Sequence, residues 1–148
     1  MHKKVYEANY GFYASPDYLK RFGIPENPED LVWHRYITHR NRNPDNVLKF
    51  RNKKEIKLKP FLSIDDSRTM IECAKQGLGI IKLHSYTVAE ALQKKELVEI
   101  LEGFDDSIQP IYLCYQPRRY IQPKIRHFID FFCAKFAKKP NTNYQKHL

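Results

Sequence analysis

The residues suited to catalysis or metal binding are two adjacent aspartates, six histidines and three cysteines. Asp65 and Asp66 could form an acid–base pair or part of a metal site, but adjacent aspartates before an apolar-periodic segment are more typical of a helix cap. The histidines, at positions 2, 34, 39, 84, 127 and 147, lack the spacing of a zinc site. The cysteines, at positions 73, 114 and 133, form no CxxC pair. We therefore predict neither a catalytic site nor a metal site.

The glycines of Gly77-Leu78-Gly79 have the wrong context for a nucleotide-binding loop. A dinucleotide-binding loop follows a strand and opens a helix. Here the glycines follow a predicted helix and open a predicted strand, so the sequence predicts no cofactor. Enzymes are thus the class of protein that these residues support least.

The elements that would position such residues alternate between strand and helix. Strands are predicted at 5–14, 35–38, 46–50, 55–59, 61–64, 79–81, 97–101 and 111–115. Helices are predicted after caps at Ser15, Asn27 and Ser85 and after the 65–67 segment, and a last helix begins at Pro123. The alternation predicts an α/β protein with helices flanking a sheet.

Composition excludes several classes of protein. The chain has 148 residues, of which 42% are hydrophobic and 14% aromatic, enough for one domain or one domain and part of another. No apolar run approaches the roughly 20 residues of a transmembrane helix, and the first residues lack the apolar stretch of a signal peptide. We expect no membrane partner, and the odd, widely spaced cysteines favour the reducing cytoplasm.

The net charge of +9 is unevenly distributed along the chain. Residues 35–59 carry nine basic and two acidic side chains, and residues 118–148 carry eight and one. Residues 60–117 carry five basic and nine acidic side chains. Basic segments of this kind indicate either binding of nucleic acid or other anions, or a solvated lysine-rich surface.

Short motifs follow one another in a family-like order over residues 10–136. They are Ala14-Ser15-Pro16-Asp17-Tyr18-Leu19, Gly23-Ile24-Pro25, Pro28-Glu29-Asp30-Leu31 with His34, Asp65-Asp66, Gly77-Leu78-Gly79-Ile80, Val88-Ala89, Glu96-Leu97-Val98, Pro110-Ile111-Tyr112-Leu113, Arg118-Arg119, Pro123-Lys124-Ile125-Arg126 and Phe128-Ile129-Asp130-Phe131. In this order and spacing the chain resembles the effector-binding domain of LysR-type transcriptional regulators.

The resemblance implies a lobe of the type 2 periplasmic-binding-protein kind, with a mixed sheet flanked by helices, plus remnants of a second lobe. Residues 14–113 would form the second lobe of the effector-binding domain, and residues 1–13 would be a crossing strand left from the first. Residues 114–138 would be the return strand and a first-lobe helix, and residues 139–148 a flexible tail. The two crossing strands, 5–14 and 111–115, should lie side by side. A DNA-reading helix-turn-helix and half of the first lobe have no counterpart in this sequence.

The resemblance also implies a small-molecule effector, bound in a cleft between lobes at the strand ends. Ligands of open α/β sheets lie beyond the carboxyl ends of strands, where helix N-termini offer free N–H groups. We expect the effector to contact Ser15, Thr38, Asp65, Asp66 and Gly79. The two aspartates would repel an anion, whereas Arg40 or Arg68 could attract one, so the effector's charge stays open.

The alternative function is a basic nucleic-acid-associated binding module. Tyr36, Arg40, Arg42, Phe50 and Arg51 mix aromatic and basic residues, as single-strand binders do. However, the aromatic residues fall at strand positions with apolar neighbours, which is typical of a core. In the resembling family operator DNA is bound through the N-terminal domain, so this chain alone should bind duplex DNA only weakly and without sequence preference.

The last predicted helix carries an apolar stripe. Ile125, Phe128, Ile129, Phe132 and Phe136 follow helical spacing. In a complete regulator the first lobe would cover this stripe. We therefore expect self-association of this chain, as a dimer or higher oligomer, through the stripe and the crossing strands.

Overall fold

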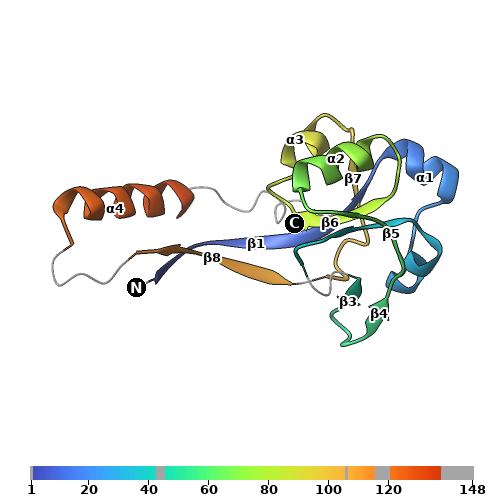
Figure 1. Ribbon diagram of the computed structural model, residues 1–148, viewed down its shortest axis with the longest axis horizontal. Helices are drawn as coiled ribbons and strands as arrows, with labels where there is room; N and C mark the ends of the chain where they lie inside the picture. The colour runs from blue at the N-terminus through green and yellow to red at the C-terminus, as the bar shows by residue number, and fades with distance from the viewer. Residues whose placement is uncertain (1, 43–45, 106, 116–120, 138–148) are drawn as a thin grey trace, which may run out of the picture. The chain divides into compact units, whose positions relative to one another are not determined.

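A computed structural model describes residues 2–42, 46–105, 107–115 and 121–137, which fall into two compact units. Unit 1 contains residues 1–8 and 109–148, and unit 2 contains residues 9–108. The tail predicted at 139–148 lies outside the described residues. Figure 1 shows the elements of each unit.

Unit 2 is built around a mixed sheet. In spatial order its strands are β5 (Pro60–Ile64), β2 (Tyr36–His39), β6 (Ile80–His84), β1 (His2–Ala14) and β7 (Val98–Ile100). Strand β2 is parallel to both β5 and β6, whereas β1 is antiparallel to both β6 and β7. The first strand of the chain therefore lies inside the sheet and runs against its neighbours.

Both faces of this sheet are covered, because successive side chains of each central strand point to opposite faces. Phe12, Tyr36 and Ile80 belong to one apolar cluster, and the residues that follow each of them belong to the other. The first cluster is closed by α1 (Pro16–Phe22), the 3-10 helix η1 (Pro28–Trp33) and the hairpin of β3 (Val47–Lys49) and β4 (Glu55–Lys57). The second is closed by α2 (Ser67–Lys75) and α3 (Ala89–Gln93), above the sheet in Figure 1.

The helices of unit 2 begin where short polar side chains satisfy free backbone N–H groups. The Ser15 hydroxyl accepts from the Tyr18 N–H at 3.2 Å, and Pro16 occupies the first helical position of α1. The Asp66 carboxylate accepts from the Thr69 N–H at 2.8 Å. Both capping predictions are confirmed, and Asp66 itself is the cap of α2.

The predicted cap at Ser85 is wrong. Helix α3 begins at Ala89 after Val88, whose side chain makes no capping hydrogen bond. Ser85 lies in a turn, which Thr87 closes by donating its hydroxyl to the His84 carbonyl at 2.6 Å. A Ser/Thr-containing segment supports either a turn or a cap, and here the turn is formed.

Unit 1 contains the start of β1, most of β8 (Ile108–Cys114) and α4 (Pro123–Ala137). Strand β8 pairs with β1, so the two predicted crossing segments do lie side by side. Within α4, Phe132 stacks on Phe128 and makes a tilted contact with Phe136, and Phe136 meets Tyr6 edge-on at 6.3 Å between ring centroids. Only Ile129 of this helix is buried among the described side chains.

Candidate functional site: the strand ends of unit 2

The five predicted contact residues lie at opposite ends of the sheet. In the antiparallel pairing of β1 with β6, Tyr10 lies opposite His84 and Tyr13 opposite Ile81. Ser15 therefore lies at the end of the sheet where β6 begins, next to Gly79. Thr38, Asp65 and Asp66 lie at the other end, where β2, β5 and β6 all finish. Along the strand register Thr38 lies three positions from the Gly79 level and Asp65 five, which is about 10 and about 17 Å, so no single small ligand spans all five.

The physical reason is strand direction. The expectation of one common site assumed that the carboxyl end of the first strand meets the carboxyl ends of the others. That holds for β2, β5 and β6, which are mutually parallel, and it fails for β1. Strand direction is a property of the pairing, which the local sequence of 5–14 does not contain.

At the Ser15 end, the groups serve mainly to hold elements together. Ser15 is 2% exposed and caps α1. Gly79 is buried, and a Cβ placed on it would lie 2.5 Å from the Arg35 carbonyl oxygen. That close approach exists because the Ile80 N–H donates to the same carbonyl at 2.8 Å.

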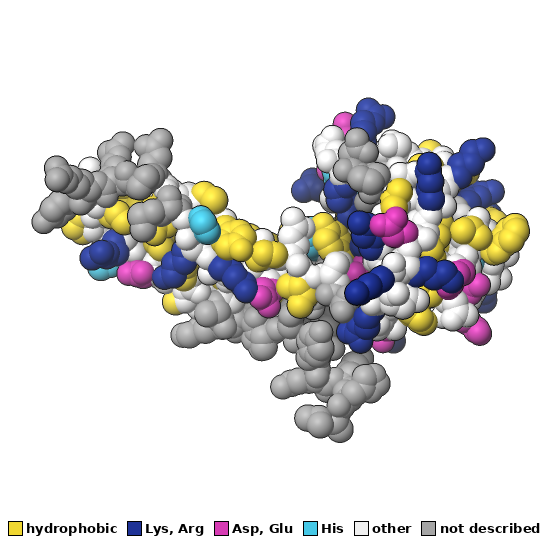
Figure 2. Space-filling model, turned by 90° about the horizontal axis from the view of Figure 1, so that it is seen from below, with side chains coloured by type: hydrophobic (Ala, Val, Ile, Leu, Met, Phe, Trp, Pro, Cys, Tyr) yellow, Lys and Arg dark blue, Asp and Glu magenta, His cyan; other side chains and the backbone are white. Residues whose placement is uncertain are grey.

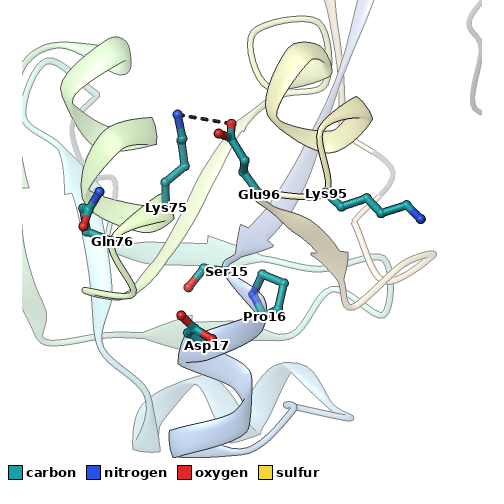
Figure 3. A pocket seen from close by; sticks show the side chains of 7 residues that line it. All are labelled: Ser15, Pro16, Asp17, Lys75, Gln76, Lys95 and Glu96. Carbon is teal, nitrogen blue, oxygen red and sulfur yellow. Dashed lines mark ion pairs between the residues drawn. The ribbon is translucent and has the colours of Figure 1, made fainter.

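A pocket of about 320 Å³ opens beside this capped helix. Figure 3 shows its lining, which carries an ion pair between Lys75 and Glu96 at 3.1 Å. Asp17 and Lys95 add one charge of each sign to the lining. A second hollow of about 500 Å³ lies between α2 and α3, and its lining likewise mixes basic and acidic side chains. These linings offer no concentrated charge of one sign.

At the other end of the sheet, the three predicted residues differ in availability. Thr38 is 5% exposed and its hydroxyl donates to the Leu62 carbonyl at 3.3 Å. Asp66 also receives the Thr69 hydroxyl at 2.6 Å, and this hydrogen bond, with that of the Thr69 N–H, holds the Asp66 pKa below its usual value. Asp65 is exposed beside it. Of the three, Asp65 is the most accessible to a ligand.

The structure adds a cluster that the sequence prediction did not include: Tyr10, Arg42, Lys82, His84 and Asp105, which we call the strand-end cluster. The Tyr10 and His84 rings stack with their centroids 4.0 Å apart. The guanidinium of Arg42 and the ammonium of Lys82 lie over the Tyr10 ring at 5.4 and 5.2 Å from its centroid. Two cations and two aromatic rings thus meet where β6 ends and β1 enters unit 2.

Ionic contacts hold this cluster in place. The Lys82 ammonium pairs with the Asp105 carboxylate at 2.7 Å, and the Asp105 side chain is only 4% exposed. Arg42 donates to the Lys82 carbonyl, also at 2.7 Å. The Lys82 charge is therefore compensated within the cluster by the buried Asp105 carboxylate.

One sequence signal for this cluster was available. Lys82 interrupts an otherwise apolar run, Gly79-Ile80-Ile81-Lys82-Leu83, and a charged residue in a central strand is rarely buried without a partner. Nothing local to Asp105 or Arg42 predicts that they are its neighbours. Among the described residues, no group of three or more His, Cys, Asp or Glu side chains is placed to hold a metal ion.

Tyr13 lies on the face of the sheet opposite to Phe12, in the apolar cluster that α2 and α3 close. Tyr13 is fully buried and its ring lies over Gly11, where a Cβ would be 2.3 Å from the phenol oxygen. Burial and the nearby carboxylates of Glu99 and Glu102 raise the Tyr13 pKa, and burial also raises the pKa of Glu99. Position 11 must therefore be glycine to leave room for the Tyr13 ring, and we assign Gly11, Tyr13 and Glu99 a structural role.

The chain matches the family model of the LysR substrate binding domain over residues 2–137. It is 32% identical over 126 residues to the HTH-type transcriptional regulator YhjC of Escherichia coli, covering 82% of this chain and 42% of YhjC. It is 29% identical over 126 residues to an HTH-type transcriptional regulator of Haemophilus influenzae, covering 83% of this chain and 44% of that protein. The chain belongs to the LysR substrate-binding domain family.

The fold agrees with this assignment. The regulatory domain of CrgA, a LysR-type transcriptional regulator from Neisseria meningitidis, superposes with a TM-score of 0.82 at 20% sequence identity. The match covers 92% of this chain and 68% of the CrgA domain. The predicted α/β fold of the type 2 periplasmic-binding-protein kind is confirmed. The family comprises transcriptional regulators rather than enzymes.

The chain spans less than half the length of the curated relatives it matches, 42% and 44% for the two above. No helix within the described residues is long and apolar enough to cross a membrane.

Proposed function

We propose that this chain senses a small-molecule effector for a LysR-type transcriptional regulator and so regulates transcription in the full-length protein. Membership of the LysR substrate-binding family supports the class of function. Operator DNA would be bound by another part of the full-length protein, and the regulator would act in the cytoplasm. The chain would bind its effector without converting it.

The strand-end cluster is the observation that supports an effector site. It gathers Arg42, Tyr10 and His84 beside the predicted contact residues Thr38 and Asp65, at the carboxyl ends of three parallel strands. Asp66, the cap of α2, adjoins the same edge. Cationic and aromatic side chains gathered at one strand end suit a small polar ligand that carries a planar or charged group.

The remaining predicted residues are assigned to positioning. Ser15 and Gly79 fix the start of α1 and the start of β6, at the opposite end of the sheet. We further propose that residues 14–113 form the second lobe of the domain, with 1–13 and 114–138 belonging to the first. The boundaries of units 1 and 2 at residues 8 and 108 support a division at these two crossings.

A thermal-shift screen of small metabolites tests the effector proposal. At least one compound should raise the melting temperature of the 148-residue chain, since a ligand at 100 times its Kd stabilises by about 2.7 kcal/mol. Arg42→Gln should weaken that shift, whereas Arg21→Gln, on α1 at the other end of the sheet, should leave it unchanged. No shift with any compound, or equal shifts in both variants, would contradict the proposal.

We also propose that the chain self-associates through α4. Phe128 and Phe131 are 56% and 65% exposed, so the outer side of this helix presents two large apolar side chains to solvent. Monomeric proteins rarely leave such a patch uncovered. A second copy of the chain would bury it.

A further inference from the structure

The β3–β4 hairpin concentrates positive charge on an exposed part of unit 2. Residues 46–59 contain six basic side chains and one acidic side chain. All six basic residues are exposed: Lys49, Arg51, Lys53, Lys54, Lys57 and Lys59. Figure 2 views the molecule from the side on which this hairpin lies in Figure 1, and Lys and Arg side chains are prominent there.

Strand pairing places the charges and the apolar side chains on opposite faces of the hairpin. Leu48 lies opposite Ile56, and Lys49 lies opposite Glu55. The apolar side chains turn inward and are no more than 7% exposed; they are Leu48, Phe50, Ile56 and Leu58. The Phe50 ring stacks on Phe12 at 5.8 Å within the core. On the outward face Val47, opposite Lys57, is apolar and partly exposed, and the other paired side chains there are charged.

Ion pairs compensate only part of this charge. Lys49 pairs with Glu55 at 3.1 Å, and Lys54 pairs with Glu29 of η1. Both pairs are largely solvent-exposed, and exposed pairs are weak. Within the described part of the chain, Lys53, Lys57 and Lys59 form no ion pair. These three ammonium groups are available to an external anion.

We propose that the outward face of the hairpin contacts the phosphate backbone of duplex DNA, without sequence preference. Duplex backbone is bound by Lys and Arg charge alone, through release of counterions. Single-stranded nucleic acid is held by aromatic side chains on which bases stack, and here Phe50 and Tyr36 are buried. A protein partner is held mainly by large apolar or aromatic anchors, whereas the paired outward side chains of this hairpin are charged apart from Val47. This mainly charged surface thus fits duplex backbone better than either alternative.

The contact would be weak in isolation. Each neutralised phosphate contributes about 0.9 to the slope of log K against log salt, so three lysines contribute between two and three. In a regulator held on DNA by another part of the protein, tethering would raise the effective concentration of backbone near the hairpin. This inference rests on the hairpin alone, and its failure leaves the proposed effector function intact.

Binding of the 148-residue chain to a fluorescent 20-base-pair duplex of arbitrary sequence tests the proposal over a range of salt concentrations. The test variant removes three hairpin charges: Lys53→Gln, Lys57→Gln and Lys59→Gln. We expect its salt slope to fall by between two and three relative to the unmodified chain. Lys57→Gln alone should lower the slope by about one, which provides a milder variant.

The matched control removes the same net charge elsewhere on unit 2, through Lys20→Gln, Lys94→Gln and Lys95→Gln, all at exposed positions. Its slope should change by less than one. An equal decrease of the salt slope in both triple variants would overturn the proposal, because binding would then depend on total charge and not on the hairpin. Absence of measurable duplex binding by the unmodified chain at low salt would overturn it too. So would tighter binding to single-stranded DNA or polyglutamate than to the duplex.

Discussion

Unit 2 and unit 1 are both rich in aromatic and aliphatic residues, but they differ in what covers those residues. In unit 2 the sheet is closed on one face by α2 and α3 and on the other by α1, η1 and the β3–β4 hairpin. Tyr13, Tyr18 and Tyr36 are fully buried there. In unit 1, Ile125, Phe128 and Phe131 of α4 remain exposed. A strong apolar stripe identifies the face of a helix that needs a partner, and the rest of the fold decides whether the partner exists.

The largest expected effect tests how tightly unit 2 is packed. Gly79→Ala should lower the free energy of unfolding by about 3 kcal/mol, because the new Cβ would press on the Arg35 carbonyl and no flexible side chain can move aside. Chemical denaturation followed by circular dichroism measures the loss.

Gly103→Ala is the matched control for that substitution. Gly103 has a φ of +82°, and nothing lies within 4 Å of an added Cβ. Its cost should stay near 1 kcal/mol, from backbone conformation alone. Equal costs at the two positions would mean that the close approach at Gly79 does not limit packing.

The next largest effect tests whether the exposed side of α4 in unit 1 mediates self-association. The double substitution Phe128→Ser and Phe131→Ser should weaken self-association by at least about tenfold per residue, since burying one such side chain is worth about 1.5–3 kcal/mol. Sedimentation velocity over a range of concentrations measures the dissociation constant.

Ile24→Ser removes an exposed apolar side chain from unit 2, where Ile24 is 66% exposed, and should leave association unchanged. If the unmodified chain is monomeric, or if both changes act alike, α4 is not the interface. The contrast between the covered sheet of unit 2 and the exposed α4 helix of unit 1 would then need another explanation.

The smallest effect concerns the cap of α2. The Thr69 hydroxyl and N–H hold the pKa of Asp66 below its unfolded-state value, so this carboxylate stabilises the native state above the unfolded pKa of about 4. That contribution is lost as the pH falls through the lowered native pKa. The melting temperature of Asp66→Asn should therefore lie slightly below that of the unmodified chain near pH 6, and the gap should close below pH 4. Asp65→Asn should show no such convergence, because only the Asp66 carboxylate caps the helix.

The local sequence was sufficient to predict the caps of α1 and α2, because a capping side chain acts on N–H groups two or three residues away. The hairpin at 46–59 was predictable for the same reason, since alternation of Ile56 and Leu58 with lysines is a local pattern. The local sequence was not sufficient at Ser85, where a helix cap was predicted and a turn is formed, because turns and caps use the same residue types.

The candidate site was less predictable because it depends on contacts between distant residues. Lys82 and Asp105 are 23 positions apart, and Arg42 reaches the Lys82 carbonyl from 40 positions away. The direction of β1 relative to β6 separated Ser15 from Thr38, and no motif around either residue records that direction. The resemblance to the family was sufficient to predict the fold. Which residues lie at each end of the sheet became known only from the strand pairing in the structure.

The interior position of β1 has a consequence for how the chain folds. Tyr10 pairs with His84 and Phe12 with Ile100, so β1 cannot complete its place in the sheet until strands far along the chain are available. Contacts of such long sequence separation slow folding, because the loop must be closed before the pairing is gained. Until those strands are available the apolar residues 9–14 lack their partners, and exposed unpaired strands of this kind promote aggregation.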